Sequence, residues 1–484
     1  MPISASDHKL WEQEQSFITK QRELHPELFV PIIKPEGTLL KRVGITAISG
    51  GAGSGFQAGQ SERPKGFIKY SPLDFIVEEI RPSGDVIAID GKEAQPEYEE
   101  GEGTIYADIT KVGISTLDAV QRVTDTLHIE NKQIGYAGIK DAVALTSQRI
   151  SFRGVTKEVV EALRVPGCLF RNVEENKGAI GVGNLMGNRF TLFIRTEKPV
   201  DENSFSKHIQ TIQQNGIMNY FGVQRFGTPR FLAHLFGMHL LRGEYKECVR
   251  AYLTKESEFE LPFFTNKRRE AGAQFGNWQK MKEIFSVLPY TFRFELQVID
   301  AMIARPNELN AIHAVGQQAS MWVRAYSSYL VNLVLSDVAQ SGKKLPNELA
   351  LMFGREQEMD PTFKPWMQKH NTINYRSFLR DLKFVQAGKN PTIEPVIYPK
   401  FHGYKILPEG MIVSFDLQKG AYATTVLEEL FQVVTGYPIP EWINRVDVDS
   451  KKELGTGNLD EVKNLLSEEI KNVMSRKVEQ EEEK

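Results

Sequence analysis

The chain has 484 residues, of which 41% are hydrophobic and 25% are charged. This composition is that of an ordinary globular protein with a substantial core, and the length allows about two or three structural units. The formal net charge of −3 excludes a chain that is basic throughout, so any site for nucleic acid must be a local patch.

Two cysteines, Cys168 and Cys248, lie far apart in the sequence and show no C-x-x-C spacing. This arrangement argues against a zinc ribbon or a disulfide framework and favours a reducing compartment. The first residues show no basic region followed by an apolar stretch, and no run of about 18 apolar residues occurs. We therefore expect no secretory signal, no membrane-spanning helix and a cytoplasmic location, or a nuclear one if the source is eukaryotic.

Residues 1–60 are interpreted as an N-terminal extension. Residues 7–22 are polar and show a weak helical periodicity. The glycine-rich run of residues 49–60 has the composition of a flexible linker. It lacks the Gly-Lys-Ser/Thr sequence of a phosphate-binding loop, so we expect no phosphate site there.

Residues 61–227 combine strand patterns with helix patterns. Short apolar or alternating runs predict strands at residues 75–77, 134–139, 149–152 and 189–195. Because strands and helices alternate without a regular βαβ repeat, the pattern predicts an α+β domain.

Two helices are predicted in the same region. The first begins at Ser115 or Thr116, which are good N-cap residues, and carries Leu117, Val120 and Leu127. The second ends at Gly216, a typical C-terminal stop. Its apolar face consists of Phe205, Ile209 and Ile212.

The pattern changes after about residue 230. Long helical patterns, such as 319–339, extend to about residue 400, and a strand pattern returns at 411–415. We therefore expect one domain, residues 61–227 and 400–448, interrupted by an inserted unit, residues 228–399. Residues 449–484 are predicted to form an amphipathic helix and a charged tail, and Asn458 with Glu461 resembles a capping box. The apolar face of this helix would consist of Leu459, Val462, Leu466, Ile470 and Val473.

One segment carries candidate chemistry. The predicted strand 134–139 is followed directly by Lys140 and Asp141, and Thr146 and Gln148 come shortly after. A carboxylate at the tip of a strand can act as a nucleophile or as a base. Taken alone, the pair could equally be an ordinary solvated ion pair.

Residues 138–148 resemble the signature of the tRNA pseudouridine synthase D family, in which G-x-K-D is followed by A-x-T-x-Q. Five further segments resemble motifs of the same family and occur in the family's order. They are residues 69–78, 187–190, 219–227 (with Arg230, His234 and Gly237 after it), 325–332 and 419–427.

The resemblance implies a fold and an activity. The implied fold is α+β, a mixed and mainly antiparallel sheet with flanking helices, interrupted by an inserted α/β domain specific to the family. The implied activity is the conversion of uridine to pseudouridine in tRNA, mainly at position 13 of the D arm, without a cofactor, nucleotide or metal. The implied partner is tRNA, with other RNAs open, and we expect a monomer that binds no membrane.

The resemblance also assigns Asp141 as the catalytic carboxylate that acts on the ribose. Whether it attacks C1' or removes a proton from C2' remains open. The carboxylate must be ionised, and burial would raise its pKa, so a nearby cation is needed. Lys69 matches a family lysine and is the candidate for that cation.

Four residues are candidates for binding the substrate base. Phe190 matches the family's uracil-stacking aromatic residue, and Asn188 could bond an edge of uracil from the same strand face. Phe75 and Tyr422 match aromatic residues that line the pocket. Ordinary core packing remains the alternative for both of them.

The basic and histidine residues are less specific. Lys140 directly precedes Asp141, and successive side chains of a strand point to opposite faces. The Lys140 side chain is therefore expected to be solvated or to face a phosphate. Arg225 and Arg230 could hold phosphates or pair with carboxylates. His234 and His239 are poorly spaced for a metal pair and are interpreted as packing or RNA contacts.

Some positions depart from the family pattern. Ala142 and Glu428 stand where the family often has basic residues, so RNA contacts could be fewer and the RNA target stays open. A non-catalytic RNA-binding protein and a nucleoside hydrolase are the competing hypotheses. The hydrolase would need a second carboxylate, which no motif supplies.

Overall fold

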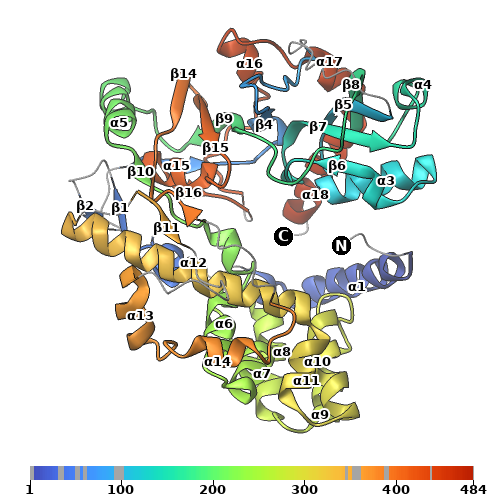
Figure 1. Cartoon of the computed structure of the whole chain (residues 1–484), viewed down its shortest axis with the longest axis vertical. Helices are drawn as coiled ribbons and strands as arrows, with labels where there is room; N and C mark the ends of the chain where they lie inside the picture. The colour runs from blue at the N-terminus through green and yellow to red at the C-terminus, as the bar shows by residue number, and fades with distance from the viewer. Residues whose placement is uncertain are drawn as a thin grey trace. The chain divides into compact units, whose positions relative to one another are not determined.

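In the computed structural model, the chain folds into two compact units (Figure 1). The first unit comprises Glu62–Gly216 and Ile397–Lys484 with the first two residues, and the second comprises Ile3–Ser61 and Ile217–Val396. The structure describes residues 5–30, 37–49, 55–57, 63–91, 103–343, 347–350, 361–385, 392–436 and 439–482.

The first unit is built on a mixed sheet with ten described strands. The strand order along the main path is β14-β15-β9-β4-β7-β5-β8, and β3, β6 and β16 pair at its sides. The pairs β4–β7 and β3–β16 are parallel and the other pairs are antiparallel. The predicted α+β class is therefore confirmed. The strands are β3 (Lys65–Phe67), β4 (Phe75–Ile80), β5 (Thr104–Lys111), β6 (Ile134–Tyr136), β7 (Leu145–Arg153), β8 (Cys168–Asn176), β9 (Gly187–Thr196), β14 (Lys400–Leu407), β15 (Gly410–Gln418) and β16 (Gln432–Val434).

The strand register places the candidate residues on one face of this sheet. Glu79 of β4 lies opposite Asn188 of β9, and Val77 lies opposite Phe190. Because side chains alternate between faces, these residues share one face with Phe75. The register of β7 and β5 adds Thr146, Gln148 and Lys111 to it. We call this side of the sheet the site face.

Helix α3 (Thr116–Leu127) covers part of the site face. Ser115 accepts a hydrogen bond from the Asp118 N–H at 3.1 Å, so the predicted helix start is confirmed. The predicted apolar face is partly wrong, because Leu117 is exposed. Instead, Val120 and Val123, with Ala119, pack against the sheet.

The C-terminal segment covers the opposite face. Leu459, Val462 and Leu466 pack with Ile76 and Leu145 of the sheet. Burying each such side chain contributes about 1.5–3 kcal/mol to the free energy of unfolding. The segment is therefore part of the core of this unit and not an appendage. Its helices are α16 (Ser450–Glu453), α17 (Asp460–Leu465) and α18 (Ser467–Glu482).

The prediction of one continuous C-terminal helix is wrong, because α17 ends at Leu465 and α18 begins at Ser467. The expected capping box is also wrong. Asn458 accepts from the Asp460 N–H at 3.1 Å, while the Leu459 N–H donates to Asp449 at 2.8 Å.

The other described helices of the first unit pack around the sheet. The predicted helix that ends at Gly216 is confirmed as α5, and its three apolar residues are buried. These helices are α4 (Lys157–Glu161), α5 (Glu202–Asn215) and α15 (Ala423–Leu430).

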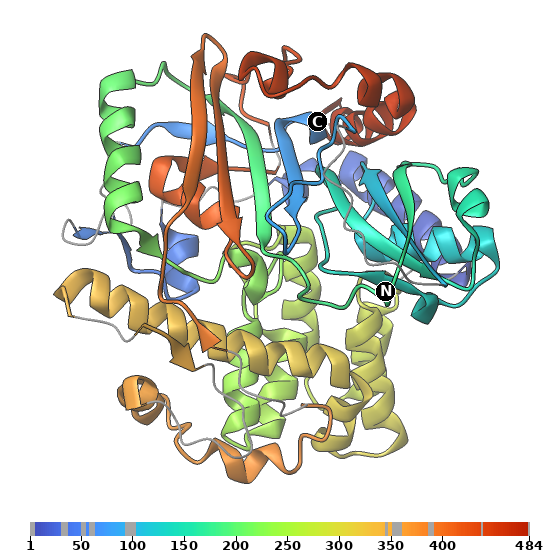
Figure 2. The same cartoon turned by 45° about the horizontal axis from the view of Figure 1, so that its top comes forward.

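The second unit is mainly helical, and its longest described helix, α12, confirms the helix predicted at 319–339 (Figure 2). Helix α6 packs closely on α12 at Gly237, where a Cβ atom would lie 2.1 Å from the Trp322 carbonyl oxygen. The described helices of the second unit are α1 (Ala5–Leu24), α2 (Thr38–Arg42), α6 (Ala233–Leu241), α7 (Tyr245–Thr254), α8 (Pro262–Ala273), α9 (Trp278–Phe285), α10 (Arg293–Ala304), α11 (Glu308–Ala314), α12 (Gly316–Ser341), α13 (Lys364–Lys369) and α14 (Tyr375–Leu379). None of the helices in the described ranges is long and apolar enough to cross a membrane.

The N-terminal segment packs within the second unit. Glu14 of α1 accepts the Tyr290 N–H at 2.8 Å, and Asn332 of α12 donates to the Val43 carbonyl oxygen at 2.9 Å. In the expected linker, β1 (Ala47–Ser49) pairs with β2 (Gly55–Gln57). Residues 50–54 and 58–62 lie outside the described residues.

Candidate active site

Asp141 lies in the loop between β6 and β7. The predicted strand 134–139 is too long, since β6 ends at Tyr136. After Tyr136, hydrogen bonds from side chains hold the loop in place of hydrogen bonds between strands. The Gly138 carbonyl oxygen accepts from the Gln148 amide at 3.0 Å, and the Lys140 N–H donates to the Thr116 hydroxyl at 2.8 Å. These two bonds fix the backbone of the loop against β7 and α3.

Lys69 and Asp141 form an ion pair, in which the ammonium group donates to one carboxylate oxygen. The other carboxylate oxygen accepts the Val143 N–H at 2.9 Å. Lys69 has a positive φ of 60°, which is uncommon outside glycine, and its ammonium lies 4.4 Å from the centre of the Phe75 ring. The cation that the sequence analysis expected beside Asp141 is therefore present.

The surroundings of Asp141 favour its ionised form. Burial acts to raise the pKa of the carboxyl group, but the Lys69 ammonium, the Val143 N–H and the Lys111 ammonium outweigh that effect and hold the pKa below its ordinary value. The side chain is 35% exposed. Asp141 is thus a charged group that a substrate can reach.

Lys111 is a site residue that the sequence analysis missed. Its buried ammonium donates to the Asp141 carbonyl oxygen at 2.8 Å and to the Ile114 carbonyl oxygen at 2.7 Å. Burial lowers the pKa of Lys111 to about 8. The available signal was a lysine on the same strand face as Ala107 and Ile109, where an apolar residue is expected.

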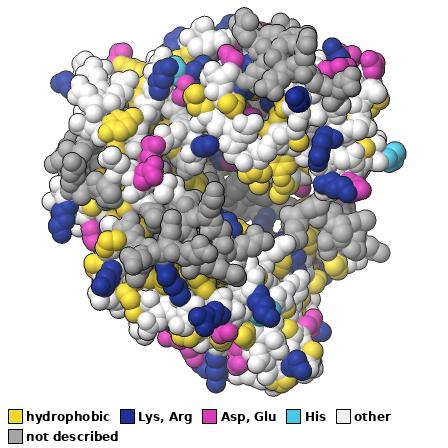
Figure 3. Space-filling view, in the orientation of Figure 1, with side chains coloured by type: hydrophobic (Ala, Val, Ile, Leu, Met, Phe, Trp, Pro, Cys, Tyr) yellow, Lys and Arg dark blue, Asp and Glu magenta, His cyan; other side chains and the backbone are white. Residues whose placement is uncertain are grey.

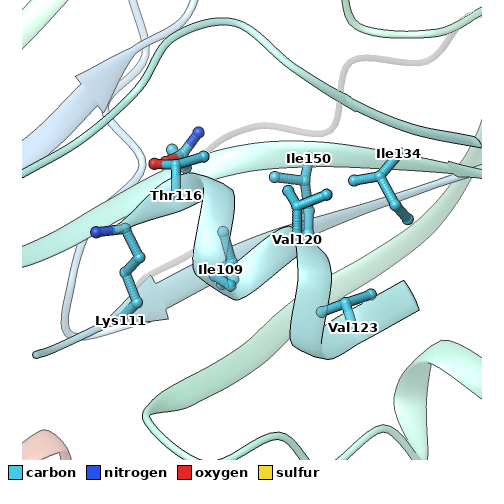
Figure 4. A pocket seen from close by; sticks show the side chains of 9 residues that line it. Ile109, Lys111, Thr116, Val120, Val123, Ile134 and Ile150 are labelled. Carbon is cyan, nitrogen blue, oxygen red and sulfur yellow. The ribbon is translucent and has the colours of Figure 1, made fainter. Parts of the chain in front are cut away.

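A small cavity lies beside Lys111, between α3 and the sheet (Figure 4). Apolar side chains such as Ile109 and Val120 line it, and Lys111 and Thr116 lie at one side. Its volume is about 10 Å³, roughly the space of one water molecule. It is therefore too small for a nucleotide and belongs to the packing of α3.

The interpretation of Lys140 as a solvated or phosphate-facing residue is wrong. Its side chain is buried, and the ammonium lies 2.6 Å from a carboxylate oxygen of Glu79 and 2.8 Å from Oδ1 of Asn188. The strand-alternation argument failed because Lys140 lies in a loop, where neighbouring side chains need not point to opposite faces.

Two of the predicted aromatic residues, Phe190 and Phe75, lie on the site face. Phe190 is 7% exposed, stacks on Phe415 with ring centres 5.6 Å apart, and meets Phe75 edge-on at 6.3 Å. Phe75 is also buried, while Tyr422 is half-buried at the start of α15. Phe75 thus also has the packing role that was its alternative interpretation, and Phe190 packs against aromatic neighbours as well.

Arg230, in the second unit, is not placed to hold a phosphate. It is buried, and its guanidinium donates to the carbonyl oxygens of Tyr252 at 2.8 Å, Ala251 at 3.2 Å and Lys255 at 2.6 Å. Burial lowers the pKa of Arg230 to about 10. It caps the C-terminal end of α7, where carbonyl groups lack helical partners.

Arg225 is different, because it is half-buried and its Nε donates to the Ser328 hydroxyl at 3.3 Å. Its guanidinium lies 5.7 Å from the Phe221 ring centre. Within the described ranges no carboxylate forms an ion pair with it. Arg225 therefore remains a candidate for a phosphate contact.

Arg225→Ala should weaken tRNA binding and reduce the dependence of log Kd on log salt by about one unit, because one phosphate contact would be lost. Arg230→Ala should instead lower the thermal unfolding midpoint, since it removes the cap of α7. Filter binding at several salt concentrations and thermal denaturation separate the two outcomes. An unchanged salt dependence in Arg225→Ala would rule out the phosphate contact.

The two histidines form no metal pair. The ring of His234 is buried and stacks on Tyr329 with centres 4.5 Å apart, and burial lowers the pKa of His234 to about 3. His239 contacts Glu244 at 2.7 Å. Among the residues that the structure describes, no three His, Cys, Asp or Glu side chains are grouped to hold a metal ion.

Known proteins match most of this chain. The family model for tRNA pseudouridine synthase D matches residues 56–388. A Methanocaldococcus jannaschii protein named "Probable tRNA pseudouridine synthase D 1" is 26% identical over 380 residues, which cover 76% of this chain and 95% of that one. The tRNA pseudouridine synthase D of Geobacter sp. strain M21 is 27% identical over 410 residues, which cover 76% and 96%.

A solved structure also matches. The crystal structure of a protein assigned as a tRNA pseudouridine synthase D from Methanosarcina mazei has a TM-score of 0.58 and 20% identity, and the match covers 84% of this chain and 99% of that one. This likeness shows a shared fold. The resemblance inferred from the motifs is confirmed, because the family model spans well over half of the sequence. The chain belongs to the tRNA pseudouridine synthase D family.

Proposed function

We propose that the protein is an isomerase that converts uridine to pseudouridine in tRNA, at position 13 of the D arm, without a cofactor. Asp141 would act on the ribose of a flipped-out uridine. The observation that carries this proposal is the partly exposed Asp141 carboxylate, held ionised by Lys69 within a member of this family.

The chemistry needs one charged carboxylate. The reaction breaks the C1'–N1 bond, turns the uracil ring and joins C5 to C1', while C5 loses a proton and N1 gains one. Asp141 could attack C1' as a nucleophile or remove a proton from C2' as a base. Both roles require the ionised form, which the lowered pKa of Asp141 supports.

The target uridine must leave its stack, which costs a few kcal/mol. An aromatic face returns about 1–3 kcal/mol per base. Because Phe190 and Phe75 are almost fully buried, a uracil ring would touch only their exposed edges, while the half-buried Tyr422 offers more surface. Asn188 is half-buried on the same face as Phe190 and would bond the base edge.

Phosphate contacts must supply much of the affinity for tRNA. Lysine and arginine side chains are scattered over the visible face of the molecule and lie among acidic ones (Figure 3). This pattern agrees with the net charge of −3. Of the basic residues that the sequence suggested for phosphate contacts, Arg225 remains the candidate, because Lys140 and Arg230 are buried against protein groups.

The proposal is tested with the purified protein and an unmodified tRNA transcript. Pseudouridine should appear at position 13, detected by carbodiimide-induced primer-extension stops, and no free uracil should be released. Free uracil on chromatography would indicate a nucleoside hydrolase. Binding without modification of any RNA pool would indicate a non-catalytic RNA-binding protein. Pseudouridine mapping across the transcriptome, with and without the protein, would then establish the other targets.

A further inference from the structure

The ammonium group of Lys140 links two strands of the site face through buried contacts. It lies 2.6 Å from Glu79 of β4 and donates to Asn188 of β9 at 2.8 Å, and Glu79 and Asn188 stand opposite each other in the strand register. The side chains of Lys140 and Glu79 are only 4% and 3% exposed. The three residues thus form a chain from a carboxylate to an ammonium to an amide.

This chain determines which way the Asn188 amide points. An ammonium group donates hydrogen bonds and cannot accept them, so the amide must turn its oxygen toward Lys140. The amide NH₂ group, a donor of two hydrogen bonds, is then directed away from Lys140. In the part of the chain that the structure describes, Lys140 provides the one hydrogen bond seen at the Asn188 side chain.

A buried ion pair is a costly way to hold two strands together. Removing both charges from water is unfavourable, and replacing a buried ion pair with well-packed apolar residues is often neutral or stabilising. The pair therefore calls for a role beyond stability. Lys140 directly precedes the proposed catalytic Asp141 in the chain, and its contact with the half-buried Asn188 amide supplies such a role.

We infer that Lys140 positions the Asn188 amide for recognition of the base; this inference rests on the proposed function. Lys140 holds Asn188 so that the amide NH₂ faces the base and donates to a carbonyl oxygen of uracil. Glu79 keeps the ammonium in place.

The inferred orientation selects one class of base edge. Uracil presents carbonyl oxygens at both C2 and C4, whereas cytosine presents an amino group at C4. A fixed donor facing C4 would accept uracil and leave two donors facing each other with cytosine. Sites that hydrogen-bond a substrate group discriminate strongly against analogues that lack it.

Thio-substituted substrates test this inference atom by atom. Transcripts would carry 2-thiouridine or 4-thiouridine at the target position, because sulfur is a weak acceptor. With wild type, one of the two should lower kcat/KM by about 2- to 10-fold, the range of a single neutral hydrogen bond. In Asn188→Ala and in Lys140→Met, the sulfur substitution should no longer lower kcat/KM. The double variant should have the same kcat/KM on the normal substrate as Asn188→Ala alone.

A Lys140→Met enzyme that keeps the wild-type sensitivity would overturn the inference. So would multiplicative losses in the double variant, because they would mean that Lys140 acts independently of Asn188. Lys132→Met is the matched control, since the side chain of Lys132 is 74% exposed. It should keep both activity and sensitivity.

Folding needs a separate safeguard, because Lys140→Met leaves a buried carboxylate without its cation. The double variant Glu79→Gln with Lys140→Met removes both charges and should restore a wild-type thermal unfolding midpoint while still lacking thio-sensitivity. Restored sensitivity in this folded variant would also overturn the inference. A wild-type enzyme that forms no pseudouridine would refute the proposed function instead, so the two failures are distinguishable.

Discussion

Asp141→Asn should lower the rate of pseudouridine formation by at least about 10²- to 10⁴-fold, the contribution of one positioned base. Asparagine keeps the shape of the side chain and can still accept the Val143 N–H. It carries no charge, so it can neither attack C1' nor take a proton from C2'. The loss would be larger still if Asp141 is the nucleophile.

Binding of tRNA should change little in this variant, because phosphate contacts dominate affinity. The measurement is a time course of carbodiimide primer-extension stops, with filter binding on the same preparations. Asp125→Asn is the matched control, since this aspartate is exposed on α3, and it should keep full activity. Equal modification by Asp141→Asn and wild type would refute the assignment of Asp141.

The variant must also fold, since Lys69 would lose its charged partner. The lowered pKa of Asp141 means that the ion pair contributes stability above the unfolded pKa of about 3.9, and that this contribution is lost as pH falls through the folded pKa. At neutral pH, Asp141→Asn should therefore show a modestly lower thermal unfolding midpoint. Native circular dichroism would show that the inactivity is not due to unfolding.

The sequence was sufficient to place a residue where its position depends on a local motif. Asp141, Asn188 and Phe190 lie in short motifs that resemble the family's signatures, and strand alternation correctly placed Asn188 and Phe190 on one face. The Lys69–Asp141 pair could be predicted because a buried carboxylate that must stay charged needs a cation.

The sequence was insufficient where a role depends on which strands become neighbours. Glu79 and Lys111 reach the site through the register of β4 with β9 and of β5 with β7, and nothing in their local sequence reports that register. Lys140 was misplaced because the strand was expected to continue to Ile139. Arg230 was expected to hold a phosphate or to pair with a carboxylate, whereas its guanidinium donates to backbone carbonyl oxygens, because burial by distant helices cannot be read from its own surroundings.

Lys69→Met should move the acid limb of the pH profile of kcat/KM upward by roughly 1–3 pH units. In wild type, Lys69 is the largest effect that opposes burial at Asp141. Without it, the Val143 N–H and Lys111 alone oppose burial, so the pKa of Asp141 rises and the ionised fraction at a given acidic pH falls. Activity should recover as pH is raised, because the higher pH ionises the carboxyl group again.

Methionine is the informative replacement at this position. Lysine and methionine both carry a Cβ atom, so the cost of the positive φ of 60° is the same in both proteins. Methionine also keeps an unbranched apolar chain over the Phe75 ring, where the lysine ammonium lies 4.4 Å from the ring centre. The difference between the two proteins is then mainly the charge beside Asp141.

Two further variants complete the Lys69 experiment. Lys69→Arg keeps the charge and should retain the wild-type acid limb, even if its kcat is lower. Lys65→Met removes an exposed lysine that pairs with Glu197 and should leave the whole profile unchanged. Lys111 does not obscure the result, because its pKa of about 8 keeps it charged throughout the acid limb. An acid limb in Lys69→Met that coincides with wild type would mean that another group keeps Asp141 ionised.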